Sequence, residues 1–319
     1  METLDVPVRT AAAVLTRRCN LSCGYCSIVR QPLPRELDET EWRQAFVTLD
    51  RLGVETLSLT GGEPTLLPFL VRLLEFAHDQ TRMRVAMATN GTFPVARAAD
   101  YARAGLAALI FSVDTLSDLP VDKSSRIKSE AALAHATAYR AAGIPRLIAN
   151  VLIHRRNLAE VPRTVARLHA LGVESHPLLL HTGEAPFWQN RGPDTGFACR
   201  PEDQPALQAL AAELRAMKRA GVTVDAPEAF LANLPRYAVG LTWQCHPFPR
   251  KLRIDADGTL SCCQDIRGAR TSTYSVFDLV DEARRLAFRR AWSIDSRLCP
   301  GCYYTDIFQA HPEADPPGV

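Results

Sequence analysis

The sequence predicts an α/β protein built on a parallel sheet. Short apolar segments alternate six times with longer amphipathic segments through the first two thirds of the chain. The apolar segments have the length and the flanking turn residues of strands buried on both faces. Repeated βα units place successive strands side by side through right-handed crossovers. This pattern alone fits either an open doubly wound sheet or a barrel.

The individual elements follow from the same pattern. Strands are expected at 11–16, 56–60, 85–89, 108–113, 147–153 and 173–180, with helices between them at 39–52, 68–78, 95–104, 129–142 and 158–171. Four of these helices end at a glycine, as helices often do: Gly53, Gly105, Gly143 and Gly172. Beyond a loop at about 184–205, helices are expected at 204–220 and 227–239. The turn Asp255-Ala256-Asp257-Gly258 predicts a hairpin of 251–254 and 259–262.

Composition excludes several classes of function. The 319 residues are 47% hydrophobic and 23% charged, which suits one large domain, or a large and a small one. A formal net charge of +2 gives no electrostatic reason to expect nucleic acid or an anionic membrane as partner. The chain shows neither a secretory signal nor a long apolar run, so we expect a soluble, cytoplasmic protein that spans no membrane.

Nine cysteines are the unusual feature of the composition. An odd number without an export signal favours metal ligation or redox chemistry over disulfides. Cys19, Cys23 and Cys26 follow the first expected strand with the spacing C-x3-C-x2-C. Three thiolates on one loop can hold three corners of a cubane and leave the fourth iron open to a small molecule. A zinc knuckle or redox thiols are the alternatives.

The cysteine motif, with Tyr25 before its last cysteine, resembles the signature of the radical S-adenosylmethionine (SAM) superfamily. The sequence Gly61-Gly62-Glu63-Pro64 after the second strand resembles the family's GGEP motif. The resemblance implies a partial (β/α)6 barrel and a 4Fe–4S cluster whose open iron binds SAM. It also implies that SAM is cleaved to a 5′-deoxyadenosyl radical that abstracts hydrogen from a substrate. The family motif is expected to approach the methionine amine, with Glu63 as hydrogen-bond acceptor.

Four further positions are candidate SAM contacts by the same resemblance. Asn90 ends the third strand, Ser112 and Asp114 end the fourth, and Arg126 is expected in the loop before the fourth helix. Barrel folds place their sites at such strand ends. In similar enzymes these positions contact the ribose and carboxylate of SAM. Asn90 could equally be a turn former, Ser112 a core residue and Arg126 a solvated charge.

A second group of cysteines lies in the last quarter of the chain. Such a group suits zinc or an iron–sulfur cluster. It resembles the twitch extension, a short form of the SPASM domain, which implies one auxiliary 4Fe–4S cluster held by Cys245, Cys263, Cys299 and Cys302. Cys262 is left over, either as a small buried residue or as a thiol that returns hydrogen to a substrate radical. We therefore expect a barrel domain at 1–200, a helical connector at 201–241 and a small hairpin-containing iron–sulfur domain at 242–319.

The motifs leave the substrate open. The Cys262-Cys263 pair favours epimerisation of an aminoglycoside or sugar, as in enzymes similar to neomycin C epimerase. Dehydrogenation of an aminocyclitol, as in enzymes resembling 2-deoxy-scyllo-inosamine dehydrogenase, and peptide modification are the alternatives. Only ten residues precede the first strand, which disfavours a peptide-recognition module there. A flavodoxin or ferredoxin is the expected electron donor. A zinc-binding interaction module is the non-enzymatic alternative.

Overall fold

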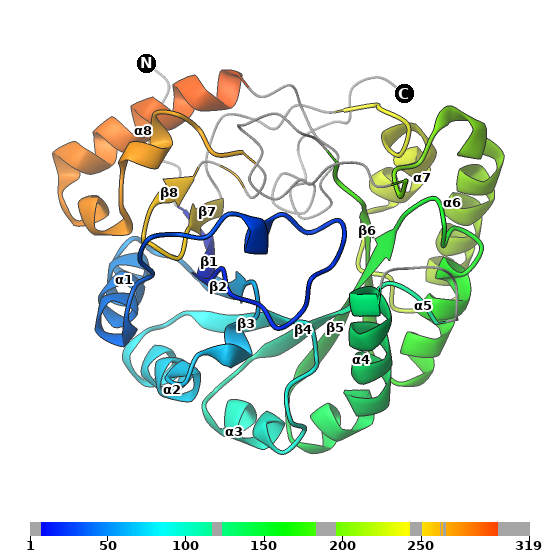
Figure 1. Cartoon of the computed structure of the whole chain (residues 1–319), viewed down its shortest axis with the longest axis horizontal. Helices are drawn as coiled ribbons and strands as arrows, with labels where there is room; N and C mark the ends of the chain where they lie inside the picture. The colour runs from blue at the N-terminus through cyan, green and yellow to red at the C-terminus, as the bar shows by residue number, and fades with distance from the viewer. Residues whose placement is uncertain are drawn as a thin grey trace.

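The computed structural model describes residues 8–116, 123–182, 196–242, 251–261, 263 and 266–298. Its strands form one sheet in the order β6-β5-β4-β3-β2-β1-β7-β8. The six predicted strands are parallel neighbours in chain order: β1 (Thr10–Thr16), β2 (Thr56–Gly61), β3 (Arg84–Thr89), β4 (Ala108–Val113), β5 (Arg146–Ile153) and β6 (Glu174–Leu179). Figure 1 shows them curving into an incomplete ring with helices outside. The predicted α/β partial barrel is confirmed.

The helices among the described residues are α1 (Glu39–Arg51), α2 (Leu70–Gln80), α3 (Arg97–Arg103), α4 (Lys123–Ala141), α5 (Val161–Ala170), α6 (Gln204–Arg219), α7 (Glu228–Tyr237) and α8 (Glu282–Arg297). Seven of them overlap their predicted positions, although α4 begins six residues earlier than expected, and α8 was not predicted. Short 3-10 turns cover Ile28–Arg30, Pro64–Leu66, Pro201–Asp203, Thr271–Thr273 and Val276–Val280. The four predicted helix-ending glycines all have positive φ, between 68° and 91°, which explains why glycine ends those helices.

The predicted hairpin is part of the barrel sheet. Strand β7 (Lys251–Ile254) turns through Gly258, at φ 85°, into the short antiparallel strand β8 (Leu260–Ser261). On its other side β7 pairs in parallel with β1, Thr10 lying opposite Lys251 and Ala13 opposite Ile254. The sheet is thus extended by a strand about 240 residues away in the chain. The boundary at residue 242 stays a prediction.

The strands are not all buried on both faces, and that part of the prediction was wrong. In β2, Leu57 and Leu59 are fully buried, while the residues between them are partly exposed. Strand β3 repeats the pattern, with Val85 and Met87 buried. Successive side chains point to opposite faces of a strand, so one face carries the core and the other faces the inside of the ring. The inside of the ring is therefore partly open.

No helix among the described residues is long and apolar enough to cross a membrane.

Candidate active site

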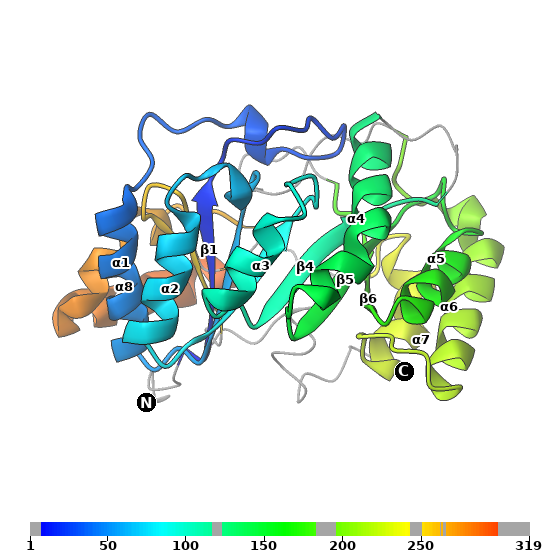
Figure 2. The same cartoon turned by 90° about the horizontal axis from the view of Figure 1, so that it is seen from below.

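The three N-terminal cysteines lie on the loop that leaves the carboxyl end of β1. Figure 2 shows this loop beyond the arrowhead of β1. Cys19, Cys23 and Cys26 are partly exposed and form no disulfide with any described residue. The loop turns tightly at its last two cysteines, where the amide of Cys26 donates to the carbonyl of Cys23 at 3.0 Å. The amide of Leu21 donates to the sulfur of Cys19 at 3.4 Å, and burial raises the pKa of that thiol.

Both ends of this cysteine loop are fixed to the turn between β7 and β8. At its start, the buried guanidinium of Arg17 forms a two-pronged ion pair with the buried carboxylate of Asp255, one prong measuring 3.0 Å. At its end, the amide of Leu37 donates to the carbonyl of Ala256 at 2.7 Å. Glu36 closes the base of the loop by accepting from the amide of Arg17 at 2.7 Å. The position of the cysteine loop therefore depends on the hairpin.

The two glycines of the predicted family motif allow β2 to approach the cysteine loop closely. The amide of Gly62 donates to the carbonyl of Thr16 at 2.7 Å. A Cβ on Gly61 would clash with that carbonyl, and one on Gly62 would clash with the carbonyl of Arg18. Gly61 also has φ 153°, which L side chains rarely adopt. In this structure the glycines thus fit β2 against the start of the cysteine loop.

Glu63 is fully buried and joins the carboxyl ends of β2 and β3. Its Oε1 accepts from the amide and hydroxyl of Thr65 at 3.1 and 2.6 Å, and from the Thr89 hydroxyl at 2.8 Å. Its Oε2 accepts from the amide of Asn90 at 2.7 Å. Several donors make a buried carboxylate tolerable. The structure thus gives Glu63 a local bonding role, and its contact with the methionine amine stays a prediction.

Tyr25 and Asp114 lie together in a buried cluster that also contains Lys128. The Tyr25 hydroxyl donates to Asp114 Oδ2 at 2.7 Å, and Lys128 Nζ lies 2.8 Å from the same oxygen. Lys128 Nζ also contacts the Tyr25 hydroxyl and lies 5.0 Å from the ring centre. Burial and the charge of Asp114 raise the pKa of Tyr25 well above its usual value. This cluster fixes the aromatic residue of the cysteine motif to the end of β4 and to α4.

Lys128 was missed by the sequence analysis, although a signal was present. It lies on the buried stripe of α4 with Ser125, Ser129, Ala132 and Ala136. A charged residue on the core-facing stripe of a helix requires a buried partner, because an unpaired buried charge is very costly. The structure supplies that partner as Asp114.

The other residues that were predicted to contact SAM lie in different surroundings. Asn90 lies beside the cysteine loop, where its Nδ2 donates to Asn20 Oδ1 at 2.8 Å and approaches the Cys19 sulfur at 3.8 Å. Ser112 lies on β4, two residues before Asp114, and Pro64 is buried in a 3-10 turn. Arg126 was expected in a loop, but α4 begins at Lys123, so Arg126 lies in the first turn of that helix. The exposed side chain of Arg126 is 3.9 Å from Glu130.

The second cysteine group falls largely outside the described residues. Cys245, Cys262, Cys299 and Cys302 lie outside them. Cys263 is partly buried, packs on the core and forms no disulfide with any described residue. Cys199 likewise forms none, and burial raises the pKa of its thiol to about 12. The auxiliary cluster and the thiol role of Cys262 stay predictions.

The residues around the cysteine loop fit an iron–sulfur cluster with a bound small molecule. Three cysteine thiols on one loop suit three corners of a cubane. Among the described residues, no three His, Cys, Asp or Glu side chains lie close enough together to hold one metal ion. A cubane does not require such a group, because each thiolate binds a separate iron. Asp114 Oδ1 is buried and accepts no hydrogen bond from any described residue. Such an acceptor suits a ligand hydroxyl or ammonium.

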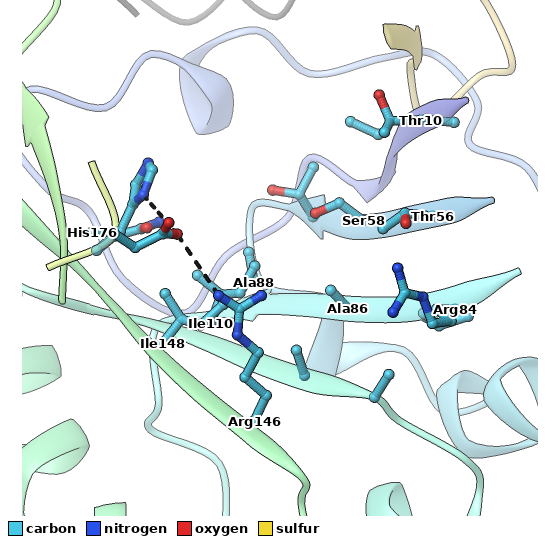
Figure 3. A pocket seen from close by; sticks show the side chains of 18 of the residues that line it. Thr10, Thr56, Ser58, Arg84, Ala86, Ala88, Ile110, Arg146, Ile148 and His176 are labelled. Carbon is cyan, nitrogen blue, oxygen red and sulfur yellow. Dashed lines mark hydrogen bonds and ion pairs between the residues drawn. The ribbon is translucent and has the colours of Figure 1, made fainter. Parts of the chain in front are cut away.

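Below this site, the inside of the ring holds a chamber of about 510 Å³. Inward side chains from β1 to β7 line it, and Figure 3 shows many of them. On the β4–β6 side the wall combines the apolar residues Ile110, Ile148 and Leu178 with the polar residues Asn150 and His176. An ionic chain crosses the chamber's edge, because Asp225 lies 3.3 Å from His176 Nδ1 and 4.0 Å from Arg146. The volume of the chamber lies in the range of sites that bind small ligands.

Comparison with protein families and curated proteins gives consistent matches. The model of the radical SAM superfamily matches residues 13–168. The PqqA peptide cyclase of Ruegeria pomeroyi is 30% identical over 283 residues, which cover 86% of this chain and 72% of the relative. A probable GTP 3′,8-cyclase of Methanopyrus kandleri is 27% identical over 210 residues, covering 65% of this chain and 68% of the relative.

Solved structures share the fold at low sequence identity. Streptococcus suis SuiB matches with a TM-score of 0.63 and 14% identity, covering 88% of this chain and 65% of SuiB. SuiB has also been solved bound to its precursor peptide SuiA. Native anSMEcpe with bound AdoMet and the Cp18Cys peptide matches with a TM-score of 0.61 and 15% identity, covering 96% of both chains.

Proposed function

Because the chain belongs to the radical SAM superfamily, we propose that it is an enzyme that holds a 4Fe–4S cluster through Cys19, Cys23 and Cys26. Family membership implies both SAM and that cluster. When bound, the cluster supplies the electron that cleaves SAM to methionine and a 5′-deoxyadenosyl radical. The observation that supports the assignment of ligands is the loop itself, which brings three cysteine thiols to the carboxyl end of β1.

The surrounding residues orient the loop and the ligand. Lys128 neutralises one oxygen of Asp114 and leaves Oδ1 as an acceptor for a SAM hydroxyl or ammonium. Tyr25 is held on the same carboxylate, so the cysteine motif and the acceptor keep a fixed relative position. Glu63 and the glycines fix the ends of β2 and β3 beside them. Preorganisation of this kind lowers the cost of binding and of reaction.

We propose a peptide as the substrate, in place of the aminoglycoside or sugar favoured by the sequence. The support is the PqqA peptide cyclase, which is similar over 86% of this chain, together with the fold shared with SuiB and anSMEcpe, both solved with peptides. None of the relatives described above is an epimerase or an aminoglycoside enzyme. Sugar epimerisation through Cys262 and dehydrogenation stay predictions, as does a separate reductant.

The decisive experiment measures cluster content and SAM cleavage after anaerobic reconstitution. Wild-type protein should form 5′-deoxyadenosine with a strong reductant, detected by mass spectrometry. Cys23→Ala should lose the iron of this site and all SAM cleavage, whereas Cys199→Ala is the matched control because Cys199 lies on the separate loop before α6. Normal cleavage by Cys23→Ala, or stoichiometric zinc without iron, would overturn the proposal.

The auxiliary cluster and the substrate need separate tests. Two clusters would give about eight iron atoms per chain, and one would give about four. Cys263→Ala should remove half of the iron if that residue is a ligand. A panel of short peptides, aminoglycosides and GTP, incubated with SAM and reductant, should show a mass change only for peptides. Turnover of an aminoglycoside alone would refute the peptide assignment.

A further inference from the structure

The chamber inside the ring is open because its inward side chains are small. Towards the amino ends of β1 to β3, the inward residues are threonine, serine and alanine, as at Thr10, Ser58 and Ala86. Arg84 is the one large side chain among them. Closed barrels instead fill their interior with bulky branched side chains. The outward neighbours Leu57 and Val85 are large and buried, so the small residues belong specifically to the inner face. A wall of small side chains leaves room inside the ring for a bound molecule.

One layer of this wall forms an arc of cations and hydroxyls at the amino edge of the sheet. Strand register places Lys251 opposite Thr10, Thr10 opposite Thr56, and Thr56 opposite Arg84. All four line the chamber. With neighbouring strands about 4.8 Å apart, the four positions span about 14 Å along the sheet. Figure 3 shows Thr10, Thr56 and Arg84 grouped at one end of the chamber.

The charges around this arc favour an anion. Three nearby carboxylates already have partners: Glu55 pairs with Arg9 at 3.0 Å, Glu174 pairs with Arg146 at 2.8 Å, and Asp225 lies 4.0 Å from Arg146 and 3.3 Å from His176 Nδ1. Arg84 is exposed, and no ion pair among the described residues includes it. A guanidinium beside hydroxyl donors is a favourable environment for a carboxylate or phosphate.

We propose that this arc, called here the anion arc (Lys251, Thr10, Thr56 and Arg84), binds an acidic group of an extended peptide substrate. This rests on the proposed function. From the arc, β2 runs six residues to the glycine motif, so the arc lies about 17 Å from the carboxyl edge that carries the cysteines. An extended peptide covers that distance in about five residues. A single sugar does not reach from one end to the other.

The shape of the chamber agrees with such an occupant. An extended chain presents alternate side chains to opposite sides. Its apolar side chains would meet Ile110, Ile148 and Leu178, while backbone groups would meet the hydroxyls of Ser58 and Thr60 across the chamber. The acidic residue at the far end would then fix which residue of the peptide reaches the reacting end.

The test measures binding of defined probes to reconstituted holoenzyme with SAM. The probes are three fluorescein-labelled hexapeptides that are identical except for their terminal residue, which is Asp, Asn or Lys. GTP serves as a fourth probe that supplies phosphate. Wild type should bind the Asp peptide at least about tenfold more tightly than the Asn peptide, since a charge-assisted bond contributes more than about 1.4 kcal/mol. Arg84→Glu should abolish this preference and Arg84→Lys should restore part of it.

Two controls separate this proposal from the proposed function. Arg51→Glu makes the same change of charge at the exposed end of α1, outside the ring, and should keep the Asp preference. SAM cleavage without peptide reports the cysteine site and should be unchanged in Arg84→Glu. Equal binding of the Asp and Asn peptides, or equal effects of Arg84→Glu and Arg51→Glu, would overturn the anion arc. Arg84-dependent binding of GTP with no peptide bound would overturn the peptide as its occupant.

Discussion

Replacing Asp255 by asparagine should destabilise the protein strongly, although Asp255 carries no predicted chemistry. The change leaves the buried guanidinium of Arg17 without a carboxylate. Breaking a buried ion pair by removing one partner costs about 3–5 kcal/mol. An independent figure comes from the pKa of Asp255, lowered to about 2 from 3.8 by Arg17 and Arg253 against the opposing effect of burial. That difference corresponds to about 2.5 kcal/mol at neutral pH. We therefore expect a loss of about 3 kcal/mol.

The assay is denaturant unfolding at pH 7 under anaerobic conditions, with Asp257→Asn as the matched control. Asp257 lies in the same turn and accepts only the Thr259 amide, at 2.9 Å, among the described contacts of its side chain. Its substitution should cost about 1 kcal/mol or less. Because the pKa of Asp255 is lower in the folded protein, its contribution is present above about pH 4 and is lost as the pH falls towards 2.

Two further measurements make the reasoning refutable. Arg17→Met combined with Asp255→Leu should recover part of the stability lost in Asp255→Asn, because position 17 then carries no unpaired buried charge, although Arg267, 3.0 Å from Asp255, loses its carboxylate partner in both variants. Asp255→Asn should also take up less iron at the cysteine loop, since the loop begins at Arg17 and ends against Ala256. A loss of stability below about 0.5 kcal/mol, with normal iron content, would show that the hairpin does not hold the loop.

Three other substitutions test the site. Gly62→Ala should destabilise by about 3 kcal/mol in denaturant unfolding, because its Cβ would clash with the backbone carbonyl of Arg18. Lys128→Met should cost about 3–5 kcal/mol and weaken SAM binding measured by calorimetry, because Asp114 is left buried without its cation, whereas Lys128→Arg should retain part of both. Burial lowers the pKa of His154 from 6.5 to about 4, so the folded state should lose about 2 kcal/mol of stability between pH 7.5 and 5; His154→Gln should remove that dependence.

Local sequence patterns were sufficient for most helices and strands but not for the long-range pairing between them. Glycines such as Gly53 and Gly172 mark helix ends because only glycine adopts positive φ there without strain. The pairing of β7 with β1 could not be predicted, because no local pattern states which strand a distant hairpin joins. Helix α8 was not predicted, since it buries only a narrow stripe that includes Phe288 and Trp292.

In the candidate site, too, residues in a local pattern could be predicted, whereas contacts between distant segments could not. Spacing alone identified Cys19, Cys23 and Cys26, because three ligands on one loop form a local pattern. The partners of Glu63 come from β3 and so depend on how two strands end side by side. The strands were predicted to be buried on both faces because alanine counts as apolar, although alanine on the inner face leaves space instead of filling it.

The pairing between β1 and β7 also has a consequence for biosynthesis. Strand β1 is synthesised well before its second neighbour β7, which follows some 240 residues later in the chain. Until then one edge of β1 offers unpaired backbone groups, and Arg17 has not met its carboxylate. Contacts so distant in the chain form late and slow the final step of folding. Maturation of the metal-binding loop should accordingly follow synthesis of β7, and nascent chains stalled before residue 251 should remain without iron.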